Sequence, residues 1–288
     1  MTGRLVVCAT PIGNLEDVTL RVLSSLREAD VIACEDTRRT RVLLDRYGAG
    51  GELVPYHEHN EDSVAGQLVE RMRAGAVVAL VSDAGMPLVS DPGYVLVRAC
   101  VAAGVAVEVL PGPSAALAAL VASALPADRW RFAGFLPRRR GELRDALSEP
   151  GGTLVAFESP HRLAMTLATL AEIDPDRPTA VCRELTKLHE EVLRGTAAQL
   201  AEAFAERNPR GEVVLVVGSP PERSTGDDEP PVGLEAVVRL VESGARPRTV
   251  AAVVGELTGE SANRLYRALV AAREEREGGE DDEDGPAG

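Results

Sequence analysis

The chain of 288 residues lacks the common motifs of nucleotide-phosphate and hydrolase sites. It contains no G-x-x-x-x-G-K-[ST] and no G-x-G-x-x-G, so its glycine loops are not standard phosphate cradles. It contains no G-x-S-x-G, and none of its four Cys has a positioned His nearby in the sequence. A hydrolase that uses a serine or cysteine nucleophile therefore lacks support.

Cysteine and histidine are too few and too scattered to indicate a metal site. The Cys residues stand singly, without the paired spacing of a zinc site or a redox couple, and we interpret them as reduced, buried thiols: Cys8, Cys34, Cys100 and Cys182. His57 and His59 flank Glu58, but no third ligand is spaced to join them. We expect no metal.

Long apolar runs and aromatic side chains are also scarce. The Ala-rich stretch 115–125 is well short of the roughly 18 apolar residues of a membrane span. The first apolar run, residues 5–9, is shorter than the roughly 7 to 15 residues of a signal-peptide core, so we expect a cytoplasmic protein without membrane contact. Aromatic residues are 3% of the chain, so stacking of RNA bases on several rings is not expected, and Tyr56 and Tyr94 are the best-placed candidates.

The net charge of -14 argues at first against a nucleic-acid partner. Residues 274–288 supply half of it, and residues 219–231 contain four more acids and one Arg. The remainder is only weakly acidic and carries basic clusters at 38–41 and 138–140. The charge distribution is therefore compatible with a nucleic-acid surface.

The most informative feature that is present is a set of four short apolar runs, each of which breaks into a compact loop of Pro, Gly and small polar residues. The runs are 5–9, 76–81, 105–110 and 153–157, and the loops that follow begin TPIGN, SDAGMP, PGPS and ESPHR. Ligands of open α/β sheets bind outside the carboxyl ends of the strands. The pattern predicts one small-molecule cleft.

Strand-like runs alternate with helical periods, which predicts two α/β domains followed by a small helical module. We place the N-terminal α/β domain at 1–113, the second at 114–218 and a Pro-rich, charged linker at 219–231. Three short helical patterns at 232–273 suit a helix-turn-helix-like module, and 274–288 is expected to be a disordered acidic tail.

The loop after the run 76–81 carries Asp83 and Asp91, with no Lys or Arg between Val77 and Leu96. A phosphate there would meet negative charge, whereas a ligand with a cationic amine or sulfonium, such as S-adenosylmethionine, would be favoured. The alternative is two tight turns in which Asp is a turn former.

Two other loops carry candidate residues. Ser114 can cap a helix whose first amides face a ligand carboxylate. Glu158 and His161 are either an acid/base pair or helix-capping residues.

Taken together, the motifs closely resemble those of the tetrapyrrole methylase family of S-adenosylmethionine-dependent methyltransferases, and within it the members that methylate small-subunit ribosomal RNA. They are ATPIGNLED (9–17), EDTR (35–38), YHEHNE (56–61), SDAGMP and SDPG (82–87 and 90–93), PGPSA (111–115) and FESPHR (157–162). The match runs in order from about residue 4 to residue 217. The segment 232–273 also resembles the small C-terminal module of these proteins.

The resemblance implies two α/β domains of tetrapyrrole methylase type, with S-adenosylmethionine in the cleft between them, in a homodimer. It implies 2'-O-methylation of a cytidine ribose in the decoding centre of 16S rRNA, within the small ribosomal subunit. Carried over by position, the residues around the cofactor are Pro11, Ile12, Gly13, Asp83, Ala84, Gly85, Met86, Ser114, Ala115 and Phe157.

A ribose hydroxyl is a poor nucleophile at neutral pH, so a proton acceptor is expected, and the candidates at strand ends are Glu35, Asp36 and Glu158. These carboxylates could instead orient Arg38 or Arg162 in structural ion pairs. The substrate-binding candidates are Arg38, Arg39, His57, Arg138, Arg139 and Arg162. A solvated basic face is the competing interpretation.

Two rival functions remain open. The first is a methyltransferase of the same fold that acts on a porphyrinoid precursor, whose site should be a broad apolar trough. The second is a regulator that binds nucleic acid through its C-terminal helices and only senses a nucleoside in the cleft.

Overall fold

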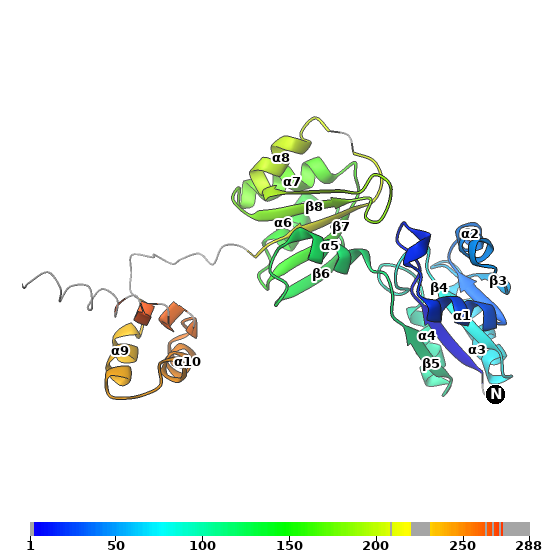
Figure 1. Cartoon of the computed structure of the whole chain (residues 1–288), viewed down its shortest axis with the longest axis horizontal. Helices are drawn as coiled ribbons and strands as arrows, with labels where there is room; N and C mark the ends of the chain where they lie inside the picture. The colour runs from blue at the N-terminus through cyan, green and yellow to red at the C-terminus, as the bar shows by residue number, and fades with distance from the viewer. Residues whose placement is uncertain are drawn as a thin grey trace, which may run out of the picture. The chain divides into compact units, whose positions relative to one another are not determined.

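The computed structural model describes residues 3–207, 209–219, 231–262, 264–266, 268–270 and 272. The chain divides into two compact units, residues 1–221 and 222–288. The first unit contains two five-stranded sheets, each in a lobe with its own helices (Figure 1). The linker and acidic tail predicted from the sequence lie almost wholly outside the described residues, and the domain boundaries stay a prediction.

The first sheet is fully parallel and has the strand order β3-β2-β4-β1-β5. Its strands are β1 (Arg4–Cys8), β2 (Val31–Cys34), β3 (Glu52–Pro55), β4 (Val77–Val81) and β5 (Ala106–Leu110). The near-continuous Val, Ile, Leu and Ala sequences of β1, β2 and β4 are typical of strands that are buried on both faces.

Helices cover both faces of this sheet. α1 (Leu20–Glu28) and α2 (Thr37–Tyr47) pack on one face, and α3 (Glu61–Arg73) and α4 (Tyr94–Ala102) pack on the other. The Thr19 side chain caps α1 by accepting a hydrogen bond from the Val22 amide. A short 3-10 helix (Leu15–Asp17) precedes α1.

The second sheet is mixed, with the order β6-β7-β10-β8-β9. Its strands are β6 (Trp130–Phe135), β7 (Thr153–Glu158), β8 (Pro178–Arg183), β9 (Glu191–Thr196) and β10 (Val213–Val217). Only β6 and β7 are parallel, and each of the other neighbouring pairs is antiparallel. α5 (Ala115–Ser123) covers one face, and the other is covered by α6 (Arg140–Ser148), α7 (Leu163–Ile173) and α8 (Ala197–Phe204).

The second unit is a small helical module with its own core. It contains α9 (Leu234–Glu242) and α10 (Pro247–Thr258), and residues 262–272 are helical where they are described. Val237, Val241, Val250 and Val254 pack with Leu265 in this core. Small helical bundles share this arrangement, so a helix-turn-helix role stays a prediction.

The four cysteines are buried and form no disulfide, which confirms their interpretation as small core residues. Burial raises the pKa of the Cys100 and Cys182 thiols to about 11, so both remain protonated at neutral pH. Within the described part of the chain, no helix is both long and apolar enough to cross a membrane.

Candidate functional site

The candidate site begins where β1 and β4 end, close to the point at which the strand order of the first sheet reverses direction. The loops that follow these strands are joined by a pair of backbone hydrogen bonds between Thr10 and Gly85, of 2.8 and 3.0 Å. The Thr10 hydroxyl also donates to the Ser82 carbonyl at 3.0 Å. Gly85 has a φ of 81°, a left-handed conformation that favours glycine. The two loops therefore form one fixed wall.

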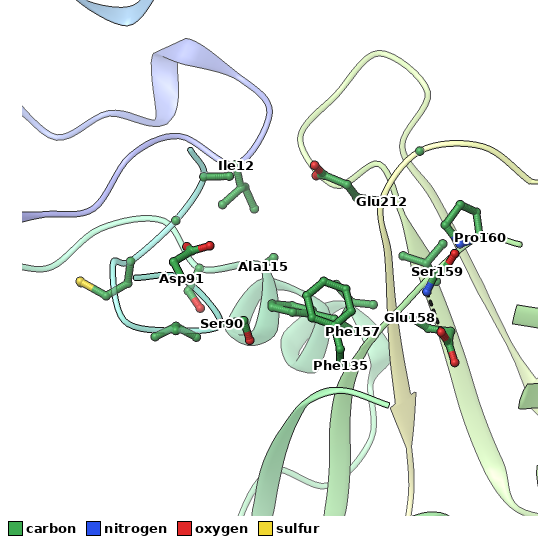
Figure 2. Close-up of a pocket in the computed structure, with 18 residues that line it drawn as sticks. Ile12, Ser90, Asp91, Ala115, Phe135, Phe157, Glu158, Ser159, Pro160 and Glu212 are labelled. Carbon is green, nitrogen blue, oxygen red and sulfur yellow. Dashed lines mark hydrogen bonds between the residues drawn. The ribbon is translucent and has the colours of Figure 1, made fainter. Parts of the chain in front are cut away.

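A cavity of about 410 Å³ lies against this wall, between the two sheets of the first unit. Its first side comes from the loops after β1 and β4 and the start of α5, and its second side from the ends of β6, β7 and β10 (Figure 2). The lining residues are Ile12, Ala84, Gly85, Met86, Val89, Ser90, Asp91, Ser114, Ala115, Phe135, Phe157, Glu158, Ser159, Pro160, Gly211, Glu212, Val213 and Val214.

Seven of the ten residues expected around the cofactor line this cavity. They are Ile12, Ala84, Gly85, Met86, Ser114, Ala115 and Phe157. Pro11 and Asp83 instead line a neighbouring pocket of about 60 Å³, together with Arg39. Gly13 is not among the residues that line either space. The contact of each residue with a cofactor stays a prediction.

Gly13 has a different reason to be glycine, because the loop between β8 and β9 packs directly on it. A Cβ atom there would lie 2.5 Å from Lys187 Cγ and 2.8 Å from both the Leu185 carbonyl and the Thr186 hydroxyl. The next amide, that of Asn14, donates to the Thr186 hydroxyl at 3.1 Å. This contact joins the loop after β1 to the second sheet.

Replacing Gly13 by Ala should therefore lower the unfolding free energy by about 1–3 kcal/mol, the usual cost of an overpacked contact. Gly66→Ala is the matched control, because a Cβ at Gly66 meets no atom within 4 Å and Ala suits its helix better. Urea unfolding measures both variants. Equal stability of Gly13→Ala and Gly66→Ala would contradict this assignment.

One part of the apolar cavity wall is aromatic. Phe157 packs edge to face against Phe132 and Phe135, with ring centroids 5.0 and 5.4 Å apart. Phe135 is 65% exposed although it lies at the end of a strand. The sequence prediction did not include it, because its place beside Phe157 depends on the pairing of β6 with β7.

Asp91 brings a carboxylate to the opposite side of the cavity (Figure 2). Burial and the negative charges of Glu35 and Asp83 together raise the pKa of Asp91 to about 6, against an opposing effect of Ser82. Burial also raises the pKa of Glu35, helped by the charges of Asp83 and Glu58. From the sequence, Asp91 could be identified only as a negative charge in the loop. Its position near Glu35 and Asp83 could not be predicted, because it depends on the fold.

The Asp36 carboxylate is already engaged in a helix cap and an ion pair. Its carboxylate caps α2, accepting from the Arg38 amide at 2.8 Å, and it also receives two hydrogen bonds from the Arg38 guanidinium, at 2.7 and 3.1 Å. These bonds hold the pKa of Asp36 at about 2. An acid with such a low pKa is a weak proton acceptor at neutral pH, so this geometry favours the ion-pair alternative for Asp36.

Glu158 lines the cavity, but its side chain is fully buried and hydrogen-bonded. It accepts from the Thr166 hydroxyl at 2.6 Å and from the Ser159 amide at 2.7 Å, and it lies 3.4 Å from the Arg162 guanidinium. Arg162 also donates to the Leu136 and Pro137 carbonyls. The geometry favours a structural ion pair that holds the FESPHR loop, for both Glu158 and Arg162.

The other basic candidates lie on the surface in two groups. Arg38 pairs with Asp36, and Arg39 lies 3.4 Å from Asp83. His57 is half-buried, and its charge acts on the nearby Glu35 carboxylate. On the second sheet's side, Arg138 and Arg139 are exposed directly after β6, and Arg139 pairs with Glu142 at 3.1 Å.

The cavity is also lined by residues at the start of β10 and directly before it, which the sequence prediction did not include, namely Gly211, Glu212, Val213 and Val214. Glu212 accepts from Lys187 at 3.0 Å, so the loop that packs on Gly13 also reaches the cavity wall. No sequence motif marks these positions. Among the described residues, no group of three or more His, Cys, Asp or Glu is arranged to hold a metal ion.

The sequence matches known proteins over most of its length. A family model described as Tetrapyrrole (Corrin/Porphyrin) Methylases matches residues 4–201. A ribosomal RNA small subunit methyltransferase I from Mesorhizobium japonicum is 44% identical over 92% of this chain and 91% of its own length. A protein of the same name from Halalkalibacterium halodurans is 48% identical over 75% of each chain.

Solved structures show the same fold. Uroporphyrin-III-C-methyltransferase from Thermus thermophilus covers 76% of this chain and 94% of its own, with a TM-score of 0.54 and 26% identity. A second structure of that enzyme is complexed with S-adenyl homocysteine, with a TM-score of 0.54, 24% identity, and coverage of 75% of this chain and 97% of its own.

Proposed function

The chain belongs to the tetrapyrrole methylase family, and from this membership we propose that it transfers a methyl group from S-adenosylmethionine to the 2'-oxygen of a cytidine ribose in the decoding centre of 16S rRNA. The observation that carries the proposal is the 44% identity, over nine-tenths of both chains, to a protein named for methylation of small-subunit ribosomal RNA. The cleft motifs lie in the part of the chain that matches.

The residues of the cavity fit S-adenosylmethionine. Phe135 and Phe157 form an apolar wall of the kind that accommodates an adenine ring. The first turn of α5, which Ser114 caps, presents backbone amides suited to the amino acid carboxylate. No Lys, Arg or His is among the lining residues, so no cationic side chain in this wall would repel a sulfonium. When bound, this cofactor supplies a methyl group that is already electrophilic.

The remaining work for the protein is alignment and proton removal. The fixed wall made by the β1 and β4 loops, together with α5, would hold the donor in place while the ribose oxygen approaches in line with the methyl group. The rRNA would enter from the side of the basic residues, where Arg39 and Arg139 are exposed.

Arg139 gives a testable RNA contact. Arg139→Glu should weaken binding of small ribosomal subunits about tenfold and reduce the salt dependence of binding by the equivalent of one ion, while cofactor affinity is unchanged. Arg73→Glu is the matched control, because Arg73 forms the same i,i+3 pair, with Glu70 at 2.9 Å. Filter binding over a salt series measures both. If the two variants lose the same affinity, Arg139 is not an RNA contact.

We also propose a cytoplasmic homodimer. Leu117 and Val121 lie four residues apart on the same face of α5 and are 51% and 82% exposed, which suits coverage by a second copy. Light scattering from the purified protein should give twice the mass of one chain. A mass equal to that of a single chain at micromolar concentration would overturn the dimer.

The choice of substrate separates this proposal from a tetrapyrrole methyltransferase. Labelled methyl transfer should be measured to unmethylated small ribosomal subunits and, in parallel, to a porphyrinoid precursor. We expect transfer to the ribosomal subunits alone. Transfer to the porphyrinoid alone would overturn the proposal, and donor binding without transfer to either acceptor would support a nucleoside-sensing regulator.

A further inference from the structure

The loop that carries Asp91 has a strained backbone. Leu88 and Ser90 adopt left-handed conformations, with φ of 73° and 64°, although neither is glycine. Such conformations are strained and persist where the surroundings fix them, often at functional sites. Ser90 directly precedes Asp91, so its backbone conformation sets the position of the Asp91 side chain.

The surroundings do fix this loop. Gly93, at φ 139°, has the Leu88 and Leu80 side chains so close that a Cβ would lie 2.7 and 3.0 Å from them. On the second sheet's side, Ser90 Oγ would lie 3.4 Å from a Cβ at Gly134. The loop is thus fixed by contacts with both lobes, and Ser90 and Asp91 both line the cavity (Figure 2).

Asp91 differs from the other carboxylates of the cavity in its partners. Glu158 lies beside Arg162 and Glu212 accepts from Lys187, so each is paired with a basic group. Within the described part of the chain, no basic group is among those that act on the Asp91 carboxylate, and Ser82 is the group that lowers its pKa. A carboxylate that no cation holds can accept a proton more readily than a paired one.

The charged groups around Asp91 come from neighbouring strand ends. Glu35 follows β2 and Asp83 follows β4, and both act on Asp91 with negative charge. Behind them, Glu58 adds negative charge to Glu35, whereas Arg39 and His57 oppose it. The charged groups that act on Asp91 are therefore acidic, which favours its protonated form.

We propose that Asp91 is the catalytic residue that accepts the proton of the ribose 2'-hydroxyl during methyl transfer. This inference rests on the proposed function. The 2'-oxygen forms a bond to the methyl carbon, the carbon–sulfur bond breaks with its electron pair on sulfur, and the hydroxyl proton passes to the Asp91 carboxylate. The products are the 2'-O-methyl ribose, the neutral thioether and protonated Asp91, which releases its proton to solvent.

The first test compares Asp91→Asn with the wild-type protein in single turnover on small ribosomal subunits. We expect the rate to fall about 10²- to 10⁴-fold, the usual contribution of a positioned base. Asp62→Asn, which removes an exposed acid from α3, is the matched control and should keep the wild-type rate. A wild-type rate for Asp91→Asn would overturn the proposal.

Cofactor-binding measurements distinguish a role of Asp91 as a base from a role in attracting the sulfonium. Calorimetry should show that Asp91→Asn binds S-adenosylmethionine and S-adenosylhomocysteine with the same ratio of affinities as the wild type. A selective loss of affinity for the cationic donor that accounts for the whole loss of rate would replace the base with an electrostatic role, and so overturn the proposal.

A titration of the free protein gives a readout that needs no activity. Carboxyl-carbon NMR of labelled Asp, assigned with Asp91→Asn, should show Asp91 titrating near pH 6. The single-turnover rate should fall as the pH drops through the same value, because the base must be ionised to act. Glu35→Gln removes one negative neighbour and should move both midpoints to lower pH. Midpoints that do not move together would overturn the assignment.

Failure of the inference can be distinguished from failure of the proposed function. If the wild-type protein transfers no methyl group to ribosomal subunits, the function is wrong. If the wild type is active and Asp91→Asn is equally active, the function stands and the role of Asp91 is wrong.

Discussion

Replacing Ala115 by phenylalanine is expected to reduce binding of S-adenosylmethionine at least 100-fold. Ala115 is the first residue of α5 and lines the cavity beside Ser114, where the amides of the first turn are proposed to face the donor. A phenyl ring at this position would occupy space that the donor needs and would cover those amides. Calorimetric titration with the donor measures the effect.

The matched control is Ala102→Phe, which adds the same ring to an exposed position in the last turn of α4. This variant should bind the donor like the wild type, and thermal unfolding should show that both variants fold. Wild-type affinity in a folded Ala115→Phe protein would mean that the donor binds elsewhere.

The second large effect is on stability. Glu158→Gln should lower the free energy of unfolding by about 2–4 kcal/mol, since removing one member of a buried, hydrogen-bonded pair leaves the other poorly compensated. The amide can keep one acceptor oxygen for the Ser159 amide, but its NH₂ group would then face the Arg162 guanidinium. Because Arg162 is 22% exposed, water screens part of this cost.

A double-mutant cycle with Arg162→Met tests the pairing, and the double variant should be more stable than the sum of the two single effects predicts. Thr166→Val removes one hydrogen bond and should cost about 1 kcal/mol. Urea unfolding measures all four. Unchanged stability of Glu158→Gln, together with a large loss of turnover, would restore Glu158 as the candidate base.

The positions of the strand ends could be predicted from the sequence because buried parallel strands are short apolar runs that end in loop residues. The predicted run 5–9 corresponds to β1 (Arg4–Cys8), and 105–110 to β5 (Ala106–Leu110). β9 was not predicted, since EVLRGT alternates only weakly and none of its residues is fully buried. The antiparallel pairing of β10 with both β7 and β8 depends on contacts distant in sequence, which spacing alone does not contain.

The roles of the acids near the site also depend on contacts that the sequence does not contain. Glu35, Asp36 and Asp91 are all acids at or near strand ends, and the sequence does not distinguish their roles. The structure distinguishes them by their neighbours: Arg38 holds the Asp36 carboxylate, whereas Asp91 lies among other acids at the cavity. Gly13, which the resemblance places beside the cofactor, is in close contact with the loop between β8 and β9, and spacing alone does not contain that contact. Its contact with a cofactor stays a prediction.

Mapping of the modified nucleotide tests the central claim most directly. Small ribosomal subunits that lack the modification would be incubated with the protein and a labelled methyl donor, and the 16S rRNA digested and analysed by mass spectrometry. We expect one new methyl group, on the 2'-oxygen of a cytidine in the decoding region. A methyl group on a base, or in another region, or no methyl group on the rRNA, would contradict it.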